Sequence, residues 1–385
     1  MRWLLLFDEL QALGGVMLLI KNQEGLKEGN APVDKLFSEI AINGISLHNR
    51  IVMPPMALAA ASETGQVTQA QLGHYGLRAR RYPVDSSGNS KKNIGVGMVL
   101  VEHCYVNEDG KAHTGQLGID QNDKISGLRD LAEAIHKEGA IAGLQISHAG
   151  ARGITNPKAP TAMHIPFLYR PSPSAETPGP EAVGFREQLE REEIEEIIED
   201  FARAAWRAKE AGFDLVEIHG AHGYLLNQFY SPLTNKRSDK YGGSVDKRLR
   251  LALEVVQVVR RAVGPHYPVI YRLGADDRQV GGTNLQDSCI AAPLLVEAGV
   301  DCLDLSGGIC GYLKDGPEGF FLYLADAIKP TVDVPILVAG GIKTAKFAAQ
   351  AIEVGKVDMV GIGRSLLLDP QWCRKVWASI YKLDS

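Results

Sequence analysis

Two histidines and a tyrosine follow a short apolar segment near the middle of the chain. Residues Leu215–Ile218 are predicted to form a buried strand, because the apolar run is short and the helix-like segment before it ends at Gly212. His219, His222 and Tyr224 follow within six residues. In enzymes built of alternating strands and helices, catalytic groups stand where a strand runs into its loop. These three side chains are therefore candidates for substrate chemistry.

The same three residues allow two other interpretations. A histidine at a strand end and a tyrosine in a loop can serve packing alone. The His-x-x-His spacing also suits a metal-dependent lyase, but no Glu or Cys stands beside it at the spacing of common zinc motifs. The five cysteines are scattered, with no C-x-x-C pair, so neither a zinc ribbon nor an iron–sulfur site is indicated. We predict no metal.

Composition indicates an enzyme that acts on small molecules in the cytoplasm. Of the 385 residues, 45% are hydrophobic and 23% are charged, which is typical of a soluble protein with a large core. The net charge of −5 and the absence of a basic stripe argue against a nucleic-acid partner. No apolar run reaches the length of a membrane span. Sparse cysteines suit a reducing compartment. A homo-oligomer is left open.

Short apolar segments alternate with amphipathic ones from Asp34 onward, which predicts an α/β fold, a (β/α)8 TIM barrel with long strand-end loops. We expect one domain over 34–385, preceded by an extension, 1–33, of unknown role. An open doubly wound sheet is the alternative. It is disfavoured because the first strand runs into Pro54-Pro55-Met56, with no G-x-G-x-x-G turn. The predicted strands are Arg50–Met56, Met98–Val106, Ile141–His148, Leu215–Gly220, Val269–Gly274, Cys302–Gly307, Ile336–Gly341 and Met359–Arg364, and the predicted helices are Ile125–Glu138, Glu192–Ala211, Asp246–Ala262, Leu285–Ala298 and Thr344–Val354.

Two loops are unusually long. Residues 149–190 follow the third strand and are rich in proline, so we expect a lid or a wall of the substrate site. Residues 82–93 precede the second strand. They are expected on the opposite, structural face of the barrel, without a catalytic role.

Other strand ends carry polar side chains or glycines. Glycines at the ends of the last two strands let backbone N–H groups approach an anion, and the arginine that follows adds a charge, which favours a phosphate site. A ring of donors beside a phosphate site suits a planar, phosphorylated cofactor. The donors are Glu102, His103, Gln145, His148 and Arg272, and the predicted phosphate site comprises Gly340, Gly341, Gly363 and Arg364.

Five stretches in the same order resemble the old yellow enzyme family of FMN-dependent ene-reductases, or NADH:flavin oxidoreductases. They are LHNRIVMPPM, LQISHAGAR, EIHGAHGYLLNQFYSPLTNKRSDKYGGS, VIYRLGADD and VDMVGIGRSLLLDP. The resemblance spans about Lys35 to Trp377. It implies FMN as cofactor and NADH or NADPH as reductant. It also implies hydride transfer to an activated alkene such as an α,β-unsaturated carbonyl compound.

The resemblance also implies a role for each candidate. His219 and His222 would grip a carbonyl or nitro oxygen, and Tyr224 would donate the proton. A tyrosine with an ordinary pKa of about 10 is protonated at neutral pH and is suited to that task. A permanently charged Arg272 would stabilise reduced flavin near N1. The remaining implied cofactor contacts are Pro55, Met56 and Ala57 along the flavin ring, Gln145 at its pyrimidine edge, and Gly340, Gly341, Gly363 and Arg364 at the phosphate.

Three positions depart from the family pattern. Ala57 stands where many members carry Cys or Thr, Ala59 where one subgroup has a tyrosine, and His103 replaces a common small residue near the flavin. The substrate is therefore left open. Alternatives are a flavoenzyme acting on nitro compounds or amines and a flavin-binding protein without turnover. Longer relatives add an iron–sulfur segment and a nucleotide-binding domain; we expect neither here.

Overall fold

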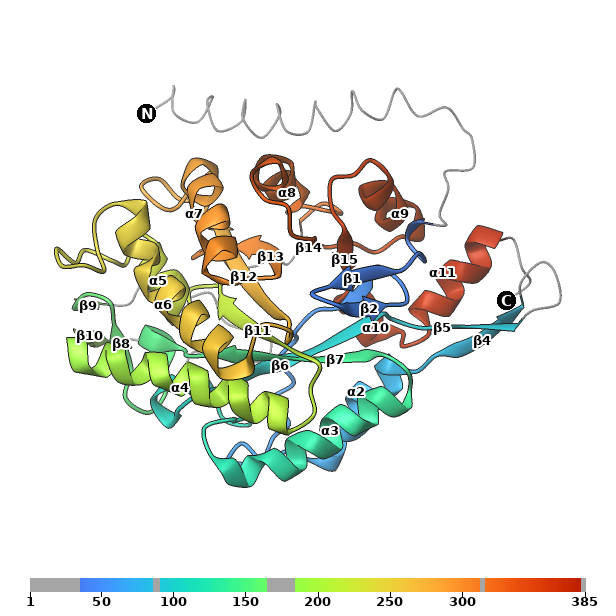
Figure 1. The fold of residues 1–385 in the computed structure, drawn as a ribbon, viewed down its shortest axis with the longest axis horizontal. Coiled ribbons are helices and arrows are strands. Elements are labelled where there is room, and N and C mark those ends of the chain that lie inside the picture. The colour runs from blue at the N-terminus through green and yellow to red at the C-terminus, as the bar shows by residue number, and fades with distance from the viewer. Residues whose placement is uncertain (1–34, 86–90, 165–183, 312–315, 382–385) are drawn as a thin grey trace.

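A computed structural model describes residues 35–85, 91–164, 184–311 and 316–381 (Figure 1). The predicted extension 1–33 lies outside the described residues, as do 165–183 in the long proline-rich loop.

Eight parallel strands close into a barrel in the order β11-β12-β13-β14-β15-β3-β6-β7, which confirms the predicted fold. Three strands are shorter than predicted by two residues or more, because the chain leaves the sheet at Pro54, Gly340 and Ile362, and two others end one residue early. The strands are β3 Ile51–Met53, β6 Met98–Tyr105, β7 Ile141–Ser147, β11 Leu215–Gly220, β12 Val269–Asp276, β13 Cys302–Gly307, β14 Ile336–Ala339 and β15 Met359–Gly361.

Helices surround the strands (Figure 1). All five predicted helices are present within one or two residues of their expected ends. The sequence analysis missed α2, α5, α8, α10 and α11, which are short or lie outside the clearest periodic segments. The helices are α2 Gln69–Ala79, α3 Ile125–Lys137, α4 Arg191–Glu210, α5 Leu225–Tyr230, α6 Val245–Val263, α7 Leu285–Ala298, α8 Leu322–Ile328, α9 Ala345–Glu353, α10 Arg364–Leu368 and α11 Trp372–Tyr381.

Local sequence explains where the best-predicted helix begins and ends. Asn284 caps α7, and its side-chain oxygen accepts hydrogen bonds from the amides of Gln286 and Asp287. Gly299 ends the helix at φ +119°, a left-handed conformation that glycine adopts without a Cβ penalty. Among the described residues, no helix is long and apolar enough to cross a membrane.

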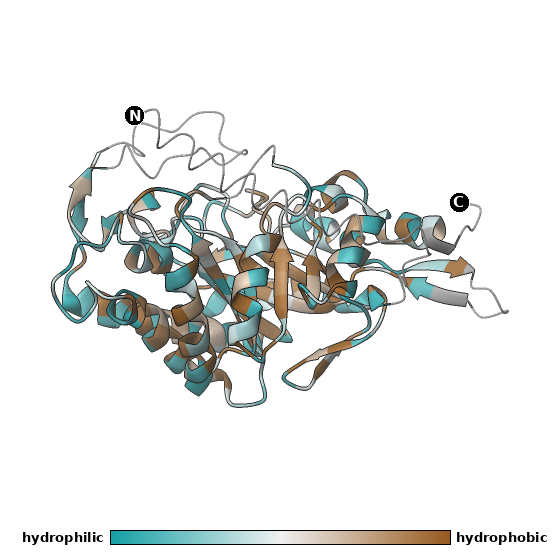
Figure 2. Ribbon diagram, turned by 90° about the horizontal axis from the view of Figure 1, so that it is seen from above, coloured by the Kyte–Doolittle hydropathy of each residue, from teal (hydrophilic) through white to brown (hydrophobic). Residues whose placement is uncertain are grey.

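The barrel interior changes character from one end to the other. At the amino-terminal end of the strands a fully buried apolar floor includes Leu215, Ile270 and Leu337. The hairpin of β1 Ile40–Ile42 and β2 Ile45–Leu47, which was not predicted, packs into this floor and closes that end. Figure 2 shows the apolar strands at the centre and polar surface on the helices. Polar side chains begin only above this floor, and this positions the site at the strands' carboxyl ends.

The insertion at 82–93 forms a hairpin of β4 Tyr82–Asp85 and β5 Lys91–Ile94. It extends beside α11, away from the barrel (Figure 1). From there the chain enters the amino-terminal end of β6. The insertion therefore lies at the end of the barrel opposite the catalytic face, as expected from the sequence.

Candidate active site

The two histidines and the tyrosine that follow β11 lie together. The ring centroids of His219 and His222 are 5.2 Å apart, and those of His219 and Tyr224 are 4.8 Å apart. β11 places His219 at its end, where only 3% of the side chain is exposed. Tyr224 precedes the first turn of α5, so strand, turn and helix each supply one ring.

The turn between strand and helix holds His222 in an unusual conformation. Its φ is +58°, a region that residues with a Cβ seldom occupy and that often marks functional sites. The amide of His222 donates to the carbonyl of Gly307 at 3.2 Å, and Nε2 lies 2.7 Å from Ser306 Oγ. The His222 carbonyl accepts a hydrogen bond from Arg152. β13 and the segment after β7 therefore fix this imidazole.

His103 joins the cluster because β6 contains a register shift. Strict alternation would turn His103 away from the barrel axis, but the pairing with β7 shifts between Val101 and Cys104. Its Nε2 lies 3.0 Å from Tyr224 Oη, and its ring is 6.2 Å from that of His219. Burial lowers the pKa of His103 to about 3, so the ring is neutral at physiological pH.

Two of the five predicted mouth donors serve other purposes. Glu102 accepts hydrogen bonds from Leu58 N at 2.7 Å and from Gln71 Nε2 at 2.9 Å, so it anchors the loop after β3. His148 accepts from the Gly150 amide at 3.0 Å and lines a separate cavity of about 490 Å³ beside α4. The expected ring thus retains His103, Gln145 and Arg272. Successive side chains of a strand point to opposite faces, and this alternation along β7 would by itself have excluded His148 from the ring of donors.

A charged layer lies between the apolar floor and the histidines. Strand pairing sets Gln145 beside Glu217, and Arg272 beside Asp304. Gln145 Nε2 donates to Glu217 Oε1 at 2.6 Å and lies 3.4 Å from His219 Nδ1. Arg272 Nε is 3.3 Å from Asp304 Oδ2. Glu217 and Asp304 were missed. The signal was a single carboxylate inside each apolar strand, VEI and LDL.

Burial controls the protonation of this layer and of the histidines above it. Desolvation is the main cause that raises the pKa of Glu217 well above its usual range, and the charge of the nearby Asp304 raises it further. Desolvation lowers the pKa values of His219 and His222 well below the usual range, and Arg272 lowers them further. At neutral pH both imidazoles are therefore uncharged, and each presents one N–H and one acceptor nitrogen.

Close approaches at the ends of β14 and β15 require glycine. Gly341 adopts φ +67°, and a Cβ there would lie 2.9 Å from the Phe320 ring. A Cβ on Gly363 would lie 2.8 Å from Met56 Sδ. A Cβ on Gly340 would lie 3.1 Å from the amide nitrogen of Phe321. This narrow, side-chain-free backbone next to Met56 fits a phosphate-bearing cofactor such as FMN.

The backbone amides just before α9, next to the predicted phosphate site, already have a partner within the protein. The carboxylate of Glu318 accepts hydrogen bonds from the amides of Lys343 and Thr344, both at 2.6 Å, at the start of α9. The amides of Gly341 and Gly363 remain the candidates for phosphate. Arg364 is exposed at the start of α10.

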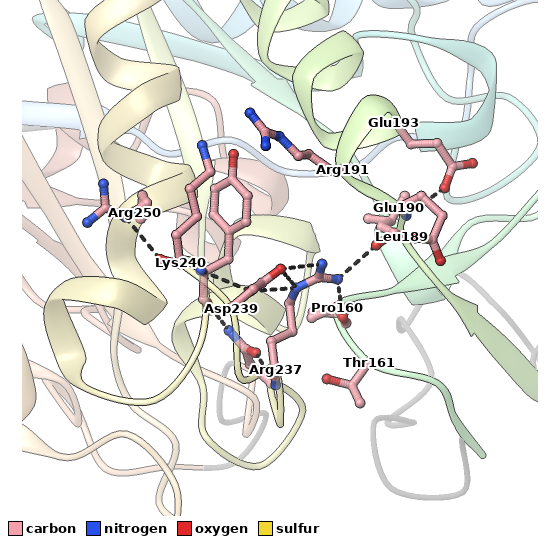
Figure 3. Close-up of polar contacts among 12 residues, drawn as sticks. Pro160, Thr161, Leu189, Glu190, Arg191, Glu193, Arg237, Asp239, Lys240 and Arg250 are labelled. Atoms are coloured by element: carbon pink, nitrogen blue, oxygen red, sulfur yellow. Dashed lines mark hydrogen bonds and ion pairs between the residues drawn. The ribbon is translucent and has the colours of Figure 1, made fainter.

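Arg237 ties down both described ends of the long proline-rich loop (Figure 3). Its Nη1 donates to the carbonyls of Pro160 and Leu189, each at 2.8 Å, while Asp239 pairs with its other nitrogens. The short strands β8 Lys158–Ala159, β9 Met163–His164 and β10 Phe185–Gln188 pair nearby. Arg237 and Asp239 in the central stretch thus have a structural role, because they fix the two ends of this loop.

Among the described residues, no group of three or more His, Cys, Asp or Glu side chains is arranged to hold a metal ion. Instead, neutral imidazoles and a phenol stand over a layer that contains a guanidinium. Such a site can donate hydrogen bonds to an oxygen on which negative charge develops.

Comparison with known proteins identifies the class. The family model for NADH:flavin oxidoreductase / NADH oxidase matches residues 35–382. An NADH oxidase from Thermoanaerobacter brockii is 40% identical over 353 residues, covering 88% of this chain and 50% of that protein. An NADPH dehydrogenase from Halalkalibacterium halodurans is 34% identical over 348 residues, covering 89% and 93%.

A solved complex of 2-naphthoyl-CoA reductase with 2-naphthoyl-CoA superposes with a TM-score of 0.80 at 27% identity, over 91% of this chain and 53% of that one. The chain thus spans about half the length of this reductase and of the Thermoanaerobacter relative. It belongs to the NADH:flavin oxidoreductase / NADH oxidase family, which confirms the resemblance noted in the sequence. Membership in this family of flavin oxidoreductases supports FMN as the cofactor.

Proposed function

We propose that this protein takes hydride from NADH or NADPH and delivers it to an electron-poor alkene, such as an α,β-unsaturated carbonyl compound. When bound, FMN supplies the hydride-transfer chemistry. The observation that carries the proposal is the convergence of His219, His222 and Tyr224 at the carboxyl end of the barrel. The NADPH dehydrogenase relative supports a nicotinamide reductant.

His219 and His222 would bind the carbonyl oxygen of the substrate. As the β-carbon receives hydride, negative charge develops on that oxygen, and imidazole N–H groups stabilise it. The imidazoles are neutral because they are buried close to Arg272. A neutral imidazole keeps its proton while it donates a hydrogen bond. The pair would therefore act as an oxyanion site, leaving protonation to another group.

Tyr224 would protonate the α-carbon. Its hydroxyl lies 3.0 Å from His103 Nε2. If this imidazole is the donor, the phenol keeps its own proton for the substrate, and the phenolate that forms is stabilised by the same N–H. His103 would then be a positioning residue for Tyr224.

The cofactor contacts stay as predicted from the sequence with two changes: His103, predicted as a cofactor contact, is assigned to Tyr224, and Glu102 is added. Gln145 and Arg272 would hold the flavin ring from the barrel interior, and the loop carrying Pro55, Met56 and Ala57 would border it. Glu102 would hold that loop in place through Leu58. Gly340, Gly341, Gly363 and Arg364 would bind the phosphate. We retain the single flavin-binding domain over 34–385 and a cytoplasmic location as predictions.

Replacing Tyr224 with Phe tests the assignment. Flavin reduction by the nicotinamide should keep its rate, and reoxidation by an enone should slow about 10²- to 10⁴-fold, the usual contribution of a general acid. The two half-reactions are measured separately by anaerobic stopped-flow absorbance. Equal losses in both would make Tyr224 structural. Purified protein should be yellow, and a colourless preparation that does not take up FMN would contradict the cofactor.

Nitro compounds are the second candidate for the acceptor. A nitro group presents oxygens to the same imidazole pair. Amines are disfavoured, since the guanidinium of Arg152 lies 5.7 Å from the centre of the Tyr224 ring and would repel a protonated amine. A panel of enones, nitroaromatics and amines offered to the reduced and oxidised enzyme separates these classes.

A further inference from the structure

Glu217 is wholly buried in the barrel, and the proposed reaction does not use it. Its neighbours are Gln145 on β7, Arg272 on β12 and Asp304 on β13. Glu217 and Asp304 are both 0% exposed, and Arg272 is 6% exposed. Two carboxyl groups thus share one guanidinium at a depth where an uncompensated charge costs several kcal/mol. One of the two carboxyl groups must carry a proton.

Hydrogen-bond partners decide which one. Asp304 lies 3.3 Å from Arg272 Nε, and that guanidinium opposes the rise that burial causes in the pKa of Asp304. Glu217 Oε1 accepts from Gln145 Nε2, and Glu217 Oε2 has no donor among the described residues. Asp304 also lacks a hydrogen-bond donor with good geometry in this part of the chain. A proton on Glu217 Oε2, shared with Asp304, would satisfy both groups.

The alternative position for the proton fails. With the proton on Oε1, the Gln145 amide would have to flip, and Glu217 Oε2 would face Asp304 with no hydrogen between two oxygens. That contact is repulsive in a buried site. With the proton on Oε2, the Gln145 amide nitrogen donates one hydrogen to Glu217 and the other toward His219 Nδ1, 3.4 Å away. His219 Nδ1 is then an acceptor, and its hydrogen resides on Nε2.

We propose that Glu217 is a permanently neutral acid that acts as a positioning residue, and that through Gln145 it holds His219 as the Nε2–H tautomer. This neutral acid also leaves Asp304 as the sole counter-ion of Arg272. The charged layer below the flavin is therefore electrically neutral overall. Only the last consequence rests on the proposed function, namely that the Nε2–H of His219 is the oxyanion donor.

The test uses FMN-loaded protein and needs no turnover. Infrared difference spectra of wild type against Glu217→Gln should show a carboxylic-acid carbonyl band that is lost in the variant and persists in wild type at pH 8. Nitrogen-15 NMR of labelled histidine should assign His219 as Nε2–H in both proteins. Glu217→Ala, which removes the support for Gln145, should populate the other tautomer.

A matched control uses Glu102, which is also a wholly buried carboxyl group of the barrel wall. It accepts from two N–H donors, and its pKa of about 7 leaves it largely ionised at pH 8, so Glu102→Gln should leave the carboxylic-acid band of wild type in place at that pH. Glu217→Gln replaces an O–H donor by an N–H donor of the same shape and should leave the thermal midpoint unchanged. Absence of the band, loss of the band in Glu102→Gln rather than in Glu217→Gln, or an Nδ1–H tautomer of His219 would each overturn the proposal. If these results hold and enones fail as substrates, only the proposed reaction is refuted.

Discussion

The hydrogen bond between His103 and Tyr224 can be measured through its effect on protonation. The two side chains are 3.0 Å apart between Nε2 and Oη, and His103 is neutral at the pH of assay. His103→Phe removes the donor and keeps a ring of similar size without changing the charge. Tyr224→Phe removes the hydroxyl. These two variants and the double variant form a thermodynamic cycle for reoxidation of the flavin by an enone.

The expected magnitudes follow from the type of contact. A neutral hydrogen bond contributes about 0.5–1.5 kcal/mol, so His103→Phe should slow alkene reduction by about 2- to 13-fold. Tyr224→Phe should slow it by about 10²- to 10⁴-fold. In the double variant no hydroxyl remains to be oriented. His103→Phe should therefore have no further effect on Tyr224→Phe, and the coupling energy should equal the whole effect of the single His103 change.

Anaerobic stopped-flow absorbance of the flavin gives both half-reactions. Reduction by the nicotinamide is the internal control and should keep its wild-type rate in all three variants. Additive losses in the double variant would mean that His103 acts independently of Tyr224, and the assigned hydrogen bond would have no catalytic role. Parallel losses in the reductive half-reaction would instead indicate disturbed flavin packing.

Three further predictions concern stability and cofactor binding. Burial lowers the pKa of His148 to about 3, so the folded protein should lose stability as the pH falls below the ordinary histidine pKa of about 6.5. His148→Asn keeps an acceptor for the Gly150 amide and should reduce the loss of unfolding free energy between pH 7.5 and pH 5.5 by about 1.4 kcal/mol. Urea unfolding measures this difference, and an unchanged pH dependence would refute it. Arg272→Gln leaves Asp304 buried without its cation and should cost about 3–5 kcal/mol of folding stability. It should also lower the reduction potential of the flavin by about 20–60 mV, measured by dye-equilibrium titration. An unchanged potential would place Arg272 away from the flavin. Gly341→Ala should cost about 1–2 kcal/mol through its positive φ and weaken FMN binding in a fluorescence titration; full FMN affinity would remove Gly341 from the phosphate site.

The barrel was predictable because buried parallel strands are short apolar runs and the helices between them are amphipathic. β11 and β13 have the bounds expected from the sequence. The hairpin of β1 and β2 was not predicted, since three-residue strands leave too short a pattern to recognise. The cluster of His219, His222 and Tyr224 was predictable because its members are close in sequence.

The rest of the site depends on contacts that no local pattern encodes. His103 faces Tyr224 only because β6 shifts register, and strict alternation would have turned it outward. Glu217 and Asp304 are separated by 87 residues, and they come next to Arg272 only because β12 pairs with both β11 and β13. Glu318 lies 25 residues before Lys343, whose amide it accepts from, and no local pattern predicts that this amide beside the phosphate candidates is already occupied.

Burial of the histidines also determines where any pH dependence near neutrality can originate. The pKa values of His103, His219 and His222 are all lowered far enough that these rings stay neutral above pH 6. Burial raises the pKa of Glu102 to about 7, so this carboxyl group ionises in the physiological range. Because the folded-state pKa lies above the unfolded value of about 4.3, its contribution to stability is full below that value and is lost as the pH rises through 7. Ionisation at the same time strengthens its hydrogen bond from Leu58, which continues the loop expected beside the flavin. Of these four buried groups, Glu102 is therefore the one that titrates between pH 6 and pH 8.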